Sequence, residues 1–530
     1  MREMDRRTIE EQGTPGLVLM ERAGRGIVRV LALRFGPLHR RVIAVVCGKG
    51  NNGGDGLVVA RLLRARGLWP RLVLTAPVDQ LSPDARVNAE RAQAAGLALE
   101  VGDPDRSLRG LSERDLLLDG LLGTGLDGPA RGSAAAWIEA MQRCPAATIA
   151  IDIPSGLSSD SGELPGPAVR AIATISMAAP KQGALFPPAR DHWGECFVVD
   201  IGIPEEISAA VGESAWLAGG SDLVRRLPAP GGATHKGDWG KLIVVGGSPG
   251  MIGAPTLAAG AALRMGAGLV RVALPRSLAP VFASRSSEAM TVLLPEGEDG
   301  QPLASGAERL LSDFGSWDAL AIGPGLGRSP EAERLVLRLL GKWRGPMVAD
   351  ADALNALAAF GSDSWVPRAR EIRAAGVAGG LVLTPHHGEM QRLSGVSIEE
   401  QRRDPLAIAR VWAERWGVTL LLKGAPSVIA SPLGVVHVNA TGNSGLATGG
   451  SGDVLSGIIG ALLAQGASGP DAALLGSHLH GLAADLVVSK PSSFAQRSLL
   501  PGDVIEALPR AIASLQSGEI PPRQRIWSVA

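Results

Sequence analysis

The chain has 530 residues, which is too long for a single hydrophobic core and predicts two to four domains. Hydrophobic residues make up 45% of it, which excludes a disordered protein, and 52 basic residues balance 52 acidic ones, so no net charge favours nucleic acid or a membrane surface as a partner. Three cysteines without a CxxC pair, and a charged first segment without an apolar core, predict a cytoplasmic protein without disulfides or structural zinc.

Strand-like and helix-like segments alternate along the first half of the chain. The expected strands are 41–47, 71–75, 116–119, 147–152 and 171–177. Such alternation predicts a parallel sheet that is covered by helices on both faces. The pattern ends in the stretch 212–235, which is rich in Gly, Pro and Ala, and we place the domain boundary there.

The first strand leads into a polar glycine loop, GKGNNGGDG. Its glycines satisfy the GxGxxG pattern of dinucleotide-binding dehydrogenases, but the acidic residue expected at the end of the second strand is missing. Asn51, Asn52 and Asp55 instead supply oxygen atoms, which suit an alkali or alkaline-earth cation. Because Asp119 and Ser155 follow two later strands, we expect Asn52, Asp119 and Ser155 to converge at the carboxyl edge of the sheet.

A second alternating series fills the rest of the chain. Its expected strands are 241–246, 269–274, 319–322, 346–349, 381–383 and 419–422, with a hairpin at 427–439. Several of these strands end in glycine-rich or polar motifs, which are IGPGLG, ADAD, TPHHGE and LLKG. The tail from Ser517 is expected to be loose.

The late stretch TGNSGLATGGSGD runs from Thr441 to Asp453 and is followed by apolar residues at helical spacing. Gly449, Gly450 and Gly452 let backbone amides turn toward one point, and amides at a helix N-terminus form an anion site, most often for phosphate. The helix dipole there favours the ionised form of Asp453, which is well placed to take a proton from a hydroxyl group that attacks the phosphate. The same pattern also fits a glycine turn in which the Asp only caps a helix.

The first half resembles NAD(P)H-hydrate epimerase domains through the strings LVLMERAG, GKGNNGGDGLVVAR, LLDGLLGTGLDGP, IDIPSGL and APKQG, which occur in this order within residues 1–215. The resemblance implies a Rossmann-like three-layer sandwich and a potassium ion held by Asn52, Asp119 and Ser155. It implies Asp152 and Lys181 as the acid–base pair, although Lys181 alone also fits an ordinary surface lysine. The implied pocket for the hydrated nicotinamide consists of Asn51, Asn52, Gly53, Gly54, Asp55, Gly123, Thr124, Gly125, Leu126, Asp127, Gly128, Pro129 and Asp152.

The second half resembles the ribokinase-like superfamily and, more closely, the ADP/ATP-dependent NAD(P)H-hydrate dehydratases. The strings HKGDWG, GAPTLAA, IGPGLG, TPHHGE, LLKG and ATGGSGD carry this likeness over residues 222–515. It implies a ribokinase-like α/β domain in which Asp453 deprotonates the ring hydroxyl while the terminal phosphoryl group of the nucleotide moves to it. The implied hydrate contacts are Ala254, Gly323, Gly325, His386 and Asp453, and the implied nucleotide contacts are Lys423, Gly424, Ala425, Pro426, Ser427 and Gly452. His386 also fits a buried, hydrogen-bonded histidine.

Together the two halves imply repair of hydrated NADH and NADPH. The first would interconvert R and S NAD(P)HX, and the second would dehydrate the S form with ADP and Mg²⁺, for which Asp350 and Asp352 are candidate ligands. The expected partners are NADHX, NADPHX and ADP in a homo-oligomer, with no nucleic acid and no membrane. Two other interpretations stay open: a vitamin or sugar kinase with an accessory Rossmann-like domain, and a first half that binds nucleotide without catalysing a reaction.

Overall fold

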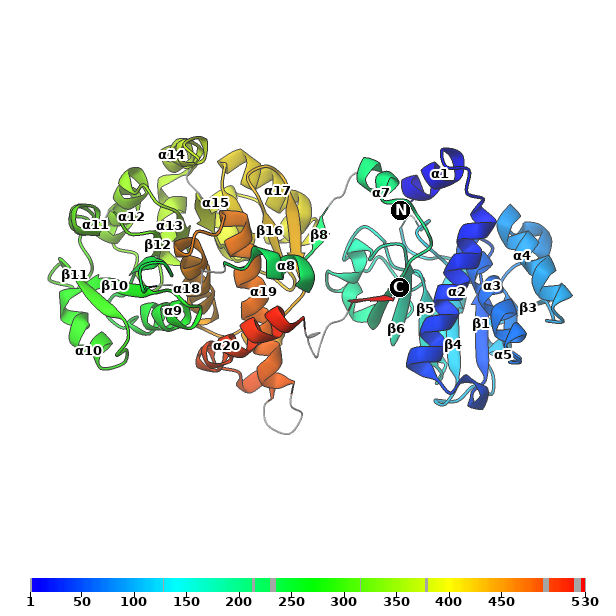
Figure 1. Ribbon diagram of the computed structural model, residues 1–530. Helices are drawn as coiled ribbons and strands as arrows, with labels where there is room; N and C mark the ends of the chain where they lie inside the picture. Colours follow the sequence, from blue (N-terminus) through cyan, green and yellow to red (C-terminus); the bar gives the residue numbers. More distant parts are fainter. Residues whose placement is uncertain are drawn as a thin grey trace. The chain divides into compact units, whose positions relative to one another are not determined.

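The computed structural model describes residues 2–126, 128–211, 215–228, 235–314, 316–376, 380–489, 495–518 and 526–529. The chain forms two compact units, one of Met1–Glu213 with Arg525–Ala530 and one of Ser214–Gln524. Each unit contains a mainly parallel sheet covered by helices (Figure 1), so the predicted α/β class with two domains is confirmed.

The sheet of the first unit has eight strands in the order β18-β7-β6-β5-β4-β1-β2-β3, and all neighbours are parallel. The strands are β1 (Ile43–Cys47), β2 (Arg71–Leu74), β3 (Glu100–Val101), β4 (Leu116–Gly120), β5 (Ala147–Ile151), β6 (Ala173–Met177), β7 (Glu195–Val199) and β18 (Ile526–Val529). The helices are α1 (Arg2–Glu10), α2 (Gly16–Phe35), α3 (Asn51–Ala65), α4 (Pro83–Ala94), α5 (Pro104–Ser107), α6 (Ser133–Arg143) and α7 (Glu205–Val211).

Alternate residues of β1 enter two different hydrophobic cores, as expected for a strand that is covered on both faces. Val45 and Cys47 pack with residues of α2, α3 and α4, whereas Ala44 and Val46 pack with residues of α6. The unit is therefore a three-layer sandwich, as predicted.

The expectation of a loose tail is wrong for residues 526–529. Their backbone forms β18, which pairs in parallel with β7 at the edge of the first sheet. A single short strand that pairs across several hundred residues of sequence leaves no periodic signal of its own, because its partner groups lie on the edge of a distant sheet.

The sheet of the second unit has ten strands in the order β11-β10-β9-β12-β13-β14-β15-β16-β17-β8. All neighbours are parallel except β16, which is antiparallel to both β15 and β17 and confirms the predicted hairpin. The strands are β8 (Trp216–Leu217), β9 (Lys241–Val245), β10 (Leu269–Pro275), β11 (Met290–Leu294), β12 (Ala319–Ile322), β13 (Met347–Ala349), β14 (Leu381–Leu383), β15 (Thr419–Leu422), β16 (Ser427–Ala430) and β17 (Val436–Asn439).

In the part of the second unit that the structure describes, thirteen α-helices lie between residues 220 and 517. They are α8 (Gly220–Arg226), α9 (Gly253–Arg264), α10 (Ala279–Ala283), α11 (Gly306–Phe314), α12 (Pro330–Lys342), α13 (Asp352–Phe360), α14 (Ser362–Ala374), α15 (His387–Ser394), α16 (Ile398–Arg403), α17 (Pro405–Trp416), α18 (Ser451–Ala464), α19 (Gly469–Val488) and α20 (Pro501–Ser517). α18 packs closely on α9 at Gly457, where a Cβ would lie only 2.1 Å from the carbonyl oxygen of Ala258. This packing fixes the N-terminus of α18.

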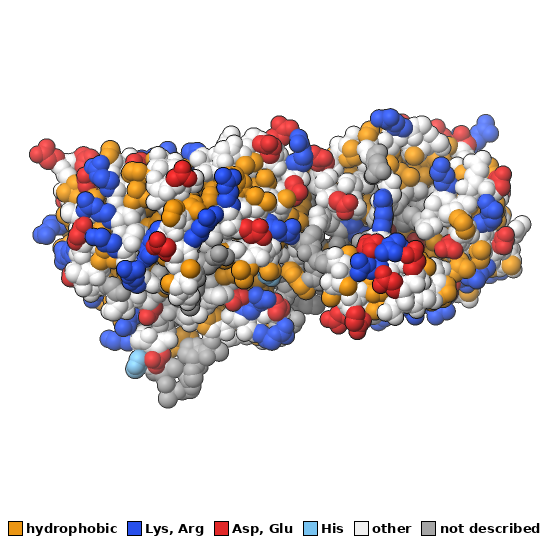
Figure 2. All heavy atoms as spheres, turned by 90° about the horizontal axis from the view of Figure 1, so that it is seen from above, with side chains coloured by type: hydrophobic (Ala, Val, Ile, Leu, Met, Phe, Trp, Pro, Cys, Tyr) orange, Lys and Arg blue, Asp and Glu red, His pale blue; other side chains and the backbone are white. Residues whose placement is uncertain are grey.

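Acidic and basic side chains are interspersed over the face shown in Figure 2, which agrees with the balanced composition. Across the described part of the chain, no helix combines the length and apolar character that crossing a bilayer requires.

Candidate active sites

The turn between β1 and α3 in the first unit is so tight that two of its positions admit only glycine. A Cβ at Gly53 would lie 1.9 Å from the carbonyl oxygen of Gly48, and a Cβ at Gly48 would lie 1.9 Å from the carbonyl oxygen of Leu121. α3 therefore begins four residues after β1, and its first two turns carry Asn52 and Asp55 next to the carboxyl edge of the sheet.

The structure brings Asn52, Asp119 and Ser155 together around the loop after β4. The hydroxyl of Ser155 donates to Asp119 Oδ1 at 2.6 Å, and the amide of Ser155 donates to Oδ2 at 2.8 Å. Asn52 Nδ2 donates to the carbonyl oxygen of Leu122 at 2.7 Å, while Ser155 Oγ accepts from the Leu122 amide at 2.8 Å. The side-chain oxygen Oδ1 of Asn52 is buried and has no hydrogen-bond partner.

Asp119 is fully buried, and this burial raises its pKa to about 6, although hydrogen bonds from Ser155 and Leu121 lower it. A buried carboxylate and an unsatisfied amide oxygen at one point both favour a cation. A buried polar atom without a partner costs about 1–3 kcal/mol. The cluster therefore offers oxygen atoms of the kind that bind a cation.

Asp152 and Lys181 form a buried ion pair at the ends of β5 and β6. Asp152 adopts a left-handed backbone with φ 65°, an uncommon conformation for a residue other than glycine. Its Oδ1 accepts hydrogen bonds from Lys181 Nζ at 2.5 Å and from the Met177 amide at 3.1 Å. Lys181 Nζ also donates to the carbonyl oxygen of Met177 at 2.9 Å, and only 4% of Lys181 is exposed. The alternative of an ordinary surface lysine is therefore wrong.

Several of the other predicted pocket residues of the first unit lie beside the oxygen cluster or at the start of α3. Gly53 and Gly54 are buried at the start of α3, and Asn51 Oδ1 accepts from Ser82 Oγ at 2.8 Å. Gly123 lies against Asn52, since a Cβ there would approach that of Asn52 to 3.2 Å. Asp127 lies outside the described residues.

Two further carboxyl groups belong to this site electrostatically. Burial raises the pKa of Asp55 well above its usual value, and the charge of Asp152 adds to the rise. Burial likewise raises the pKa of Asp5 in α1; the positive charge of the N-terminus lowers it, Asp152 raises it and Lys181 lowers it. Sequence reasoning missed Asp5, because one Asp in a run of alternating charges carries no motif.

In the second unit, the loop 441–453 leads to the N-terminus of α18, where Gly450 has φ 92°. Asp485 of α19 holds the beginning of this loop by accepting from the amide of Gly442 at 2.8 Å. A Cβ at Gly449 would meet nothing within 4 Å. The loop is thus anchored at its beginning and open at Gly449, beside the N-terminus of α18, where a cradle for an anion needs space.

Lys423, at the end of β15, lies beside this cradle in a network of buried acids. Its Nζ is 2.6 Å from Asp350 Oδ1 and 3.8 Å from Glu389 Oε2. Asp350 Oδ2 also accepts from Ser456 Oγ of α18 at 2.7 Å. A Cβ at Gly452 would lie 3.3 Å from Lys423 Nζ. Lys423 therefore presents its ammonium group at the first turn of α18. Sequence reasoning missed Glu389, although it ends the TPHHGE motif.

Asp453 is half-buried in the first turn of α18. Burial raises its pKa to about 7, the charge of Asp350 adds to this rise, and Lys423 opposes it. The helix dipole is expected to favour the ionised form of Asp453, but burial and the charge of Asp350 act in the opposite direction and raise its pKa. A carboxyl group with a pKa near the working pH is suited to general base catalysis.

His386 caps α15 rather than lying in the core. Its Nδ1 accepts from the amides of Gly388 at 3.0 Å and Glu389 at 3.3 Å, and Glu389 Oε2 accepts from the His386 amide at 2.9 Å. Its side chain is 54% exposed, so the alternative of a buried histidine is wrong. Burial of the ring lowers its pKa, and the positive charge of Lys423 lowers it further, so the ring is neutral near pH 7.

The glycine turn after β12 contacts Asp350, directly after β13, and Ala254 in α9. Gly323 has φ 121°, and a Cβ there would lie 1.9 Å from the carbonyl oxygen of Asp350. A Cβ at Gly325 would lie 3.1 Å from that of Ala254 in α9, and the Gly327 amide donates to Asp352 Oδ2 at 2.9 Å. Asp352 therefore fastens this turn, which the structure places against the α9 N-terminus.

The five residues from Lys423 to Ser427 form the turn between β15 and β16. The hydroxyl of Ser427 donates to the carbonyl oxygen of Gly424 at 3.2 Å and closes this turn. The predicted nucleotide segment is thus one compact turn that starts at Lys423.

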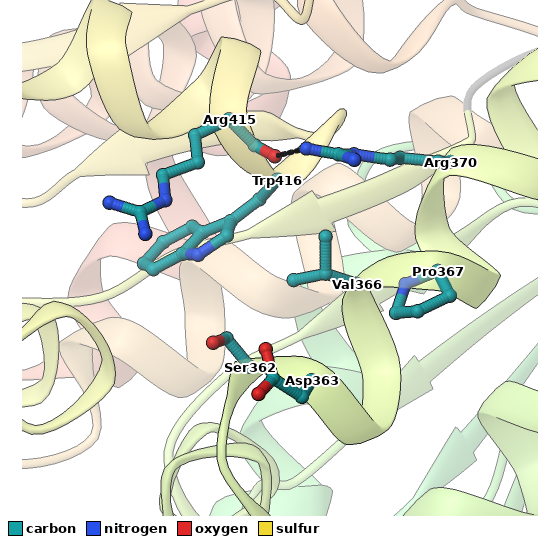
Figure 3. A pocket seen from close by; sticks show the side chains of 7 residues that line it. All are labelled: Ser362, Asp363, Val366, Pro367, Arg370, Arg415 and Trp416. Carbon is teal, nitrogen blue, oxygen red and sulfur yellow. Dashed lines mark hydrogen bonds between the residues drawn. The ribbon is translucent and has the colours of Figure 1, made fainter.

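A hollow of about 550 Å³ lies elsewhere in the second unit, between α14 and α17 (Figure 3). Arg370 spans one side of it and donates to the carbonyl oxygen of Arg415 at 2.6 Å. It is lined by Ser362, Asp363, Val366, Pro367, Arg370, Arg415 and Trp416, none of which is a predicted site residue.

Among the residues that the structure describes, no three His, Cys, Asp or Glu side chains group so as to hold a metal ion.

Comparison with known proteins gives a consistent result over both units. Residues 242–510 match the family model described as NAD(P)H-hydrate dehydratase, and residues 16–183 match the one described as YjeF-related protein N-terminus. The bifunctional NAD(P)H-hydrate repair enzyme of Moorella thermoacetica is 42% identical over 97% of this chain and 96% of its own length. The enzyme of the same description from Escherichia coli is 37% identical over 93% of this chain and 89% of its own length. A solved ADP/ATP-dependent NAD(P)H-hydrate dehydratase from Bacillus subtilis, co-crystallised with ATP and Mg²⁺, is 28% identical, with a TM-score of 0.48 over 57% of this chain and 99% of that one.

Proposed function

The chain belongs to the family of bifunctional NAD(P)H-hydrate repair enzymes, and from this premise we propose how its two units divide the work. The protein restores NADH and NADPH from their hydrates: it epimerises R and S NAD(P)HX and dehydrates the S form at the expense of ADP. We assign the epimerase to residues 1–215 and the dehydratase to residues 222–515. The observation that carries this proposal is Asp453, whose pKa of about 7 and position beside Lys423 suit a base next to a phosphate cradle.

In the dehydratase, Asp453 takes the proton from the ring hydroxyl of the hydrate. The freed oxygen attacks the terminal phosphorus of ADP, and the bond to the AMP oxygen breaks. The phosphorylated oxygen then leaves the ring carbon as phosphate, and loss of a proton from the neighbouring carbon restores the double bond. The amides of the loop before α18 stabilise the negative charge that develops during phosphoryl transfer. Ala254, Gly323, Gly325 and His386 surround the hydrate in this proposal.

Lys423, Gly452 and the turn 424–427 hold the nucleotide. The ammonium group of Lys423 is fixed by Asp350 and Glu389 and faces the first turn of α18. Phosphate oxygens seated at that turn would meet both the backbone amides and this positive charge. Lys423 therefore neutralises the phosphoryl group during transfer.

Magnesium is proposed to reach the protein together with the nucleotide. Asp350 already binds Lys423 and Ser456, and Asp352 binds the amide of Gly327, so both candidate carboxylates are engaged within the protein. When bound, the ion would screen the charge of the phosphates.

The pH dependence of the dehydratase tests the role of Asp453. Because its pKa is raised to about 7, the carboxyl is protonated below that pH and cannot accept the hydroxyl proton. We expect kcat/KM for the S hydrate, measured at fixed ADP, to fall about tenfold per pH unit below pH 7 and to level off above it. A profile that stays flat down to pH 5 would contradict the assignment.

In the epimerase, Asp152 and Lys181 move a proton at the hydrated carbon. Protonation of the hydroxyl lets water leave, and the lone pair of the ring nitrogen forms an iminium ion. Water then adds from the other face and gives up a proton, which inverts the configuration. Asn51–Asp55, Gly123–Leu126, Gly128 and Pro129 form the walls of the pocket in this proposal.

The oxygen cluster of the first unit fits the expected potassium ion, and we propose Asn52 Oδ1, Asp119 and Ser155 as its ligands. The fit rests on the unpaired, buried Oδ1 of Asn52 and on the single carboxylate, which suits one positive charge. When bound, the ion would supply positive charge that keeps Asp119 ionised. Asn52 and Ser155 would also hold the loop after β4, through Leu122, beside the pocket.

Unfolding experiments test the potassium site without measuring activity. We expect KCl to raise the melting temperature of the first unit above its value in choline chloride of equal ionic strength. Stabilisation by about 1.4 kcal/mol corresponds to a potassium concentration of about ten times Kd. Asn52→Ala should abolish this difference, and Asn51→Ala, the neighbouring control outside the cluster, should keep it. An Asn52→Ala protein that still responds to KCl would rule the site out.

The expected homo-oligomer stays a prediction, which sedimentation velocity can check.

A further inference from the structure

The helix α19 contacts the glycine loop that leads into α18. Asp485 accepts from the amide of Gly442 at 2.8 Å and from Asn443 Nδ2 at 2.9 Å. Gly481, one turn before Asp485, lets the loop approach closely, since a Cβ there would lie 2.4 Å from Thr441 Oγ1. α19 therefore fixes the beginning of the loop.

The end of the loop is less restrained by its own backbone. Packing on α9 fixes the axis of α18, but the ends of helices fray. Two glycines precede the first turn: Gly450 has φ 92°, and a Cβ at Gly449 would meet nothing within 4 Å. Because glycine backbone adopts many conformations, these two residues do not by themselves hold the first turn in one place. A side-chain contact from that turn to a rigid neighbour supplies the missing restraint.

His480 of α19 makes this contact with Ser451, the first residue of α18. His480 Nε2 lies 3.3 Å from Ser451 Oγ, within hydrogen-bond distance, and only 7% of His480 and 8% of Ser451 is exposed. Ser451 directly precedes Gly452, where a Cβ would lie 3.3 Å from Lys423 Nζ, and it lies two residues before Asp453. The contact therefore ties the first turn of α18 to the helix that also holds the beginning of the loop.

The charge state of His480 distinguishes between the roles open to it. Burial lowers its pKa to about 4, the positive charge of Lys423 lowers it further, and a hydrogen bond with the backbone of Ser451 opposes this. The imidazole is therefore neutral near pH 7. A neutral, buried ring adds no charge to the phosphate cradle and is suited to holding a hydroxyl group rather than to binding phosphate.

We propose that His480 is a positioning residue of the dehydratase, which holds Ser451 and thereby keeps the first turn of α18 in the geometry that phosphoryl transfer requires. This inference rests on the function proposed for the second unit. Amides and a base act on a transition state only while they keep their places, and a misplacement of about 1 Å can cost about 100-fold in rate. In this role His480 acts through Ser451 without touching the substrate.

A double-mutant cycle tests the contact in the full chain. We expect His480→Leu to lower kcat for dehydration of S NADHX at saturating ADP by about tenfold or more, because leucine fills the space but makes no hydrogen bond. His480→Gln, whose amide can still bond to Ser451, should retain most of the rate. In a Ser451→Ala background, where the contact is already lost, His480→Leu should lower kcat by less than about twofold.

The matched control is His478→Leu, which changes another buried histidine of α19. Within the described part of the chain, Nδ1 of His478 has no hydrogen-bond partner. This variant should keep the wild-type kcat. All variants should exchange R and S NADHX at the wild-type rate, and their melting temperatures show whether the second unit is folded.

The outcomes separate this inference from the function on which it rests. If wild type forms no NADH from S NADHX and ADP, the proposed function of the second unit fails. If wild type forms NADH and His480→Leu keeps its kcat, the role of His480 alone is overturned. An equal loss from His480→Leu with and without the Ser451 hydroxyl also overturns it, because altered packing would act in both backgrounds.

A second pair of variants decides the matter if His480→Leu does not fold. Ser451→Thr keeps the hydroxyl group and should keep the wild-type kcat, whereas Ser451→Ala should lose about tenfold. Equal rates for these two variants would overturn the proposal.

Discussion

Asp453→Asn is expected to lower the rate of dehydration by about 100- to 10,000-fold, with little change in the affinity for ADP. Asparagine keeps the shape of the side chain in the first turn of α18 but cannot take the hydroxyl proton. Lys423 and the loop amides, which are proposed to hold the phosphates, remain in place. The measurement is the initial rate of NADH formation from purified S NADHX and ADP.

The matched control for this variant is Asp313→Asn, which changes an exposed carboxylate of α11 in the same unit. It should keep the wild-type rate, and both variants should exchange the two epimers normally. If an Asp453→Asn protein retains more than about a tenth of the wild-type dehydration rate, Asp453 is not the general base of the reaction.

Asp152→Asn is expected to reduce epimer exchange to the spontaneous rate. Asparagine tolerates the left-handed backbone at this position, so the variant isolates the loss of the carboxylate. With ADP present, wild type should consume a mixture of R and S NADHX completely. The variant should consume the S fraction rapidly and then slow to the spontaneous rate of exchange.

The same substitution should also destabilise the first unit, because it leaves the ammonium group of Lys181 buried without a counter-charge. Breaking a buried ion pair costs about 3–5 kcal/mol. Asp152→Asn combined with Lys181→Met removes both charges and should recover much of this stability without recovering exchange. If the double variant regains exchange, the ion pair does not carry the chemistry.

Much of the fold could be predicted from the sequence, because the buried strands of a parallel sheet are continuous apolar runs. The run RVIAVVC, for example, contains β1. The glycine loops could be predicted as well, since Gly53 and Gly323 stand where a Cβ would collide with backbone. The collision at Gly53 is with Gly48, five residues earlier, whereas that at Gly323 is with Asp350 on a neighbouring strand end.

The charges of the two sites could not be predicted in the same way. The burial of Lys181 and the pKa of Asp453 depend on neighbours that are distant in sequence, such as Asp350 for Asp453. Glu389 joins its site only because folding brings its Oε2 to 3.8 Å from Lys423 Nζ, a residue 34 positions later. Sequence patterns indicate which residues can ionise, whereas folding decides what surrounds them.

The central claim is that one chain repairs both epimers and that phosphorylation of the hydrate is only a step toward water loss. The most direct test is to incubate the protein with a mixture of R and S NADHX and limiting ADP, and to count NADH, AMP and inorganic phosphate. We predict one AMP and one phosphate for every NADH formed, from either epimer. A stable phosphorylated hydrate that accumulates without NADH would contradict the claim and indicate a kinase.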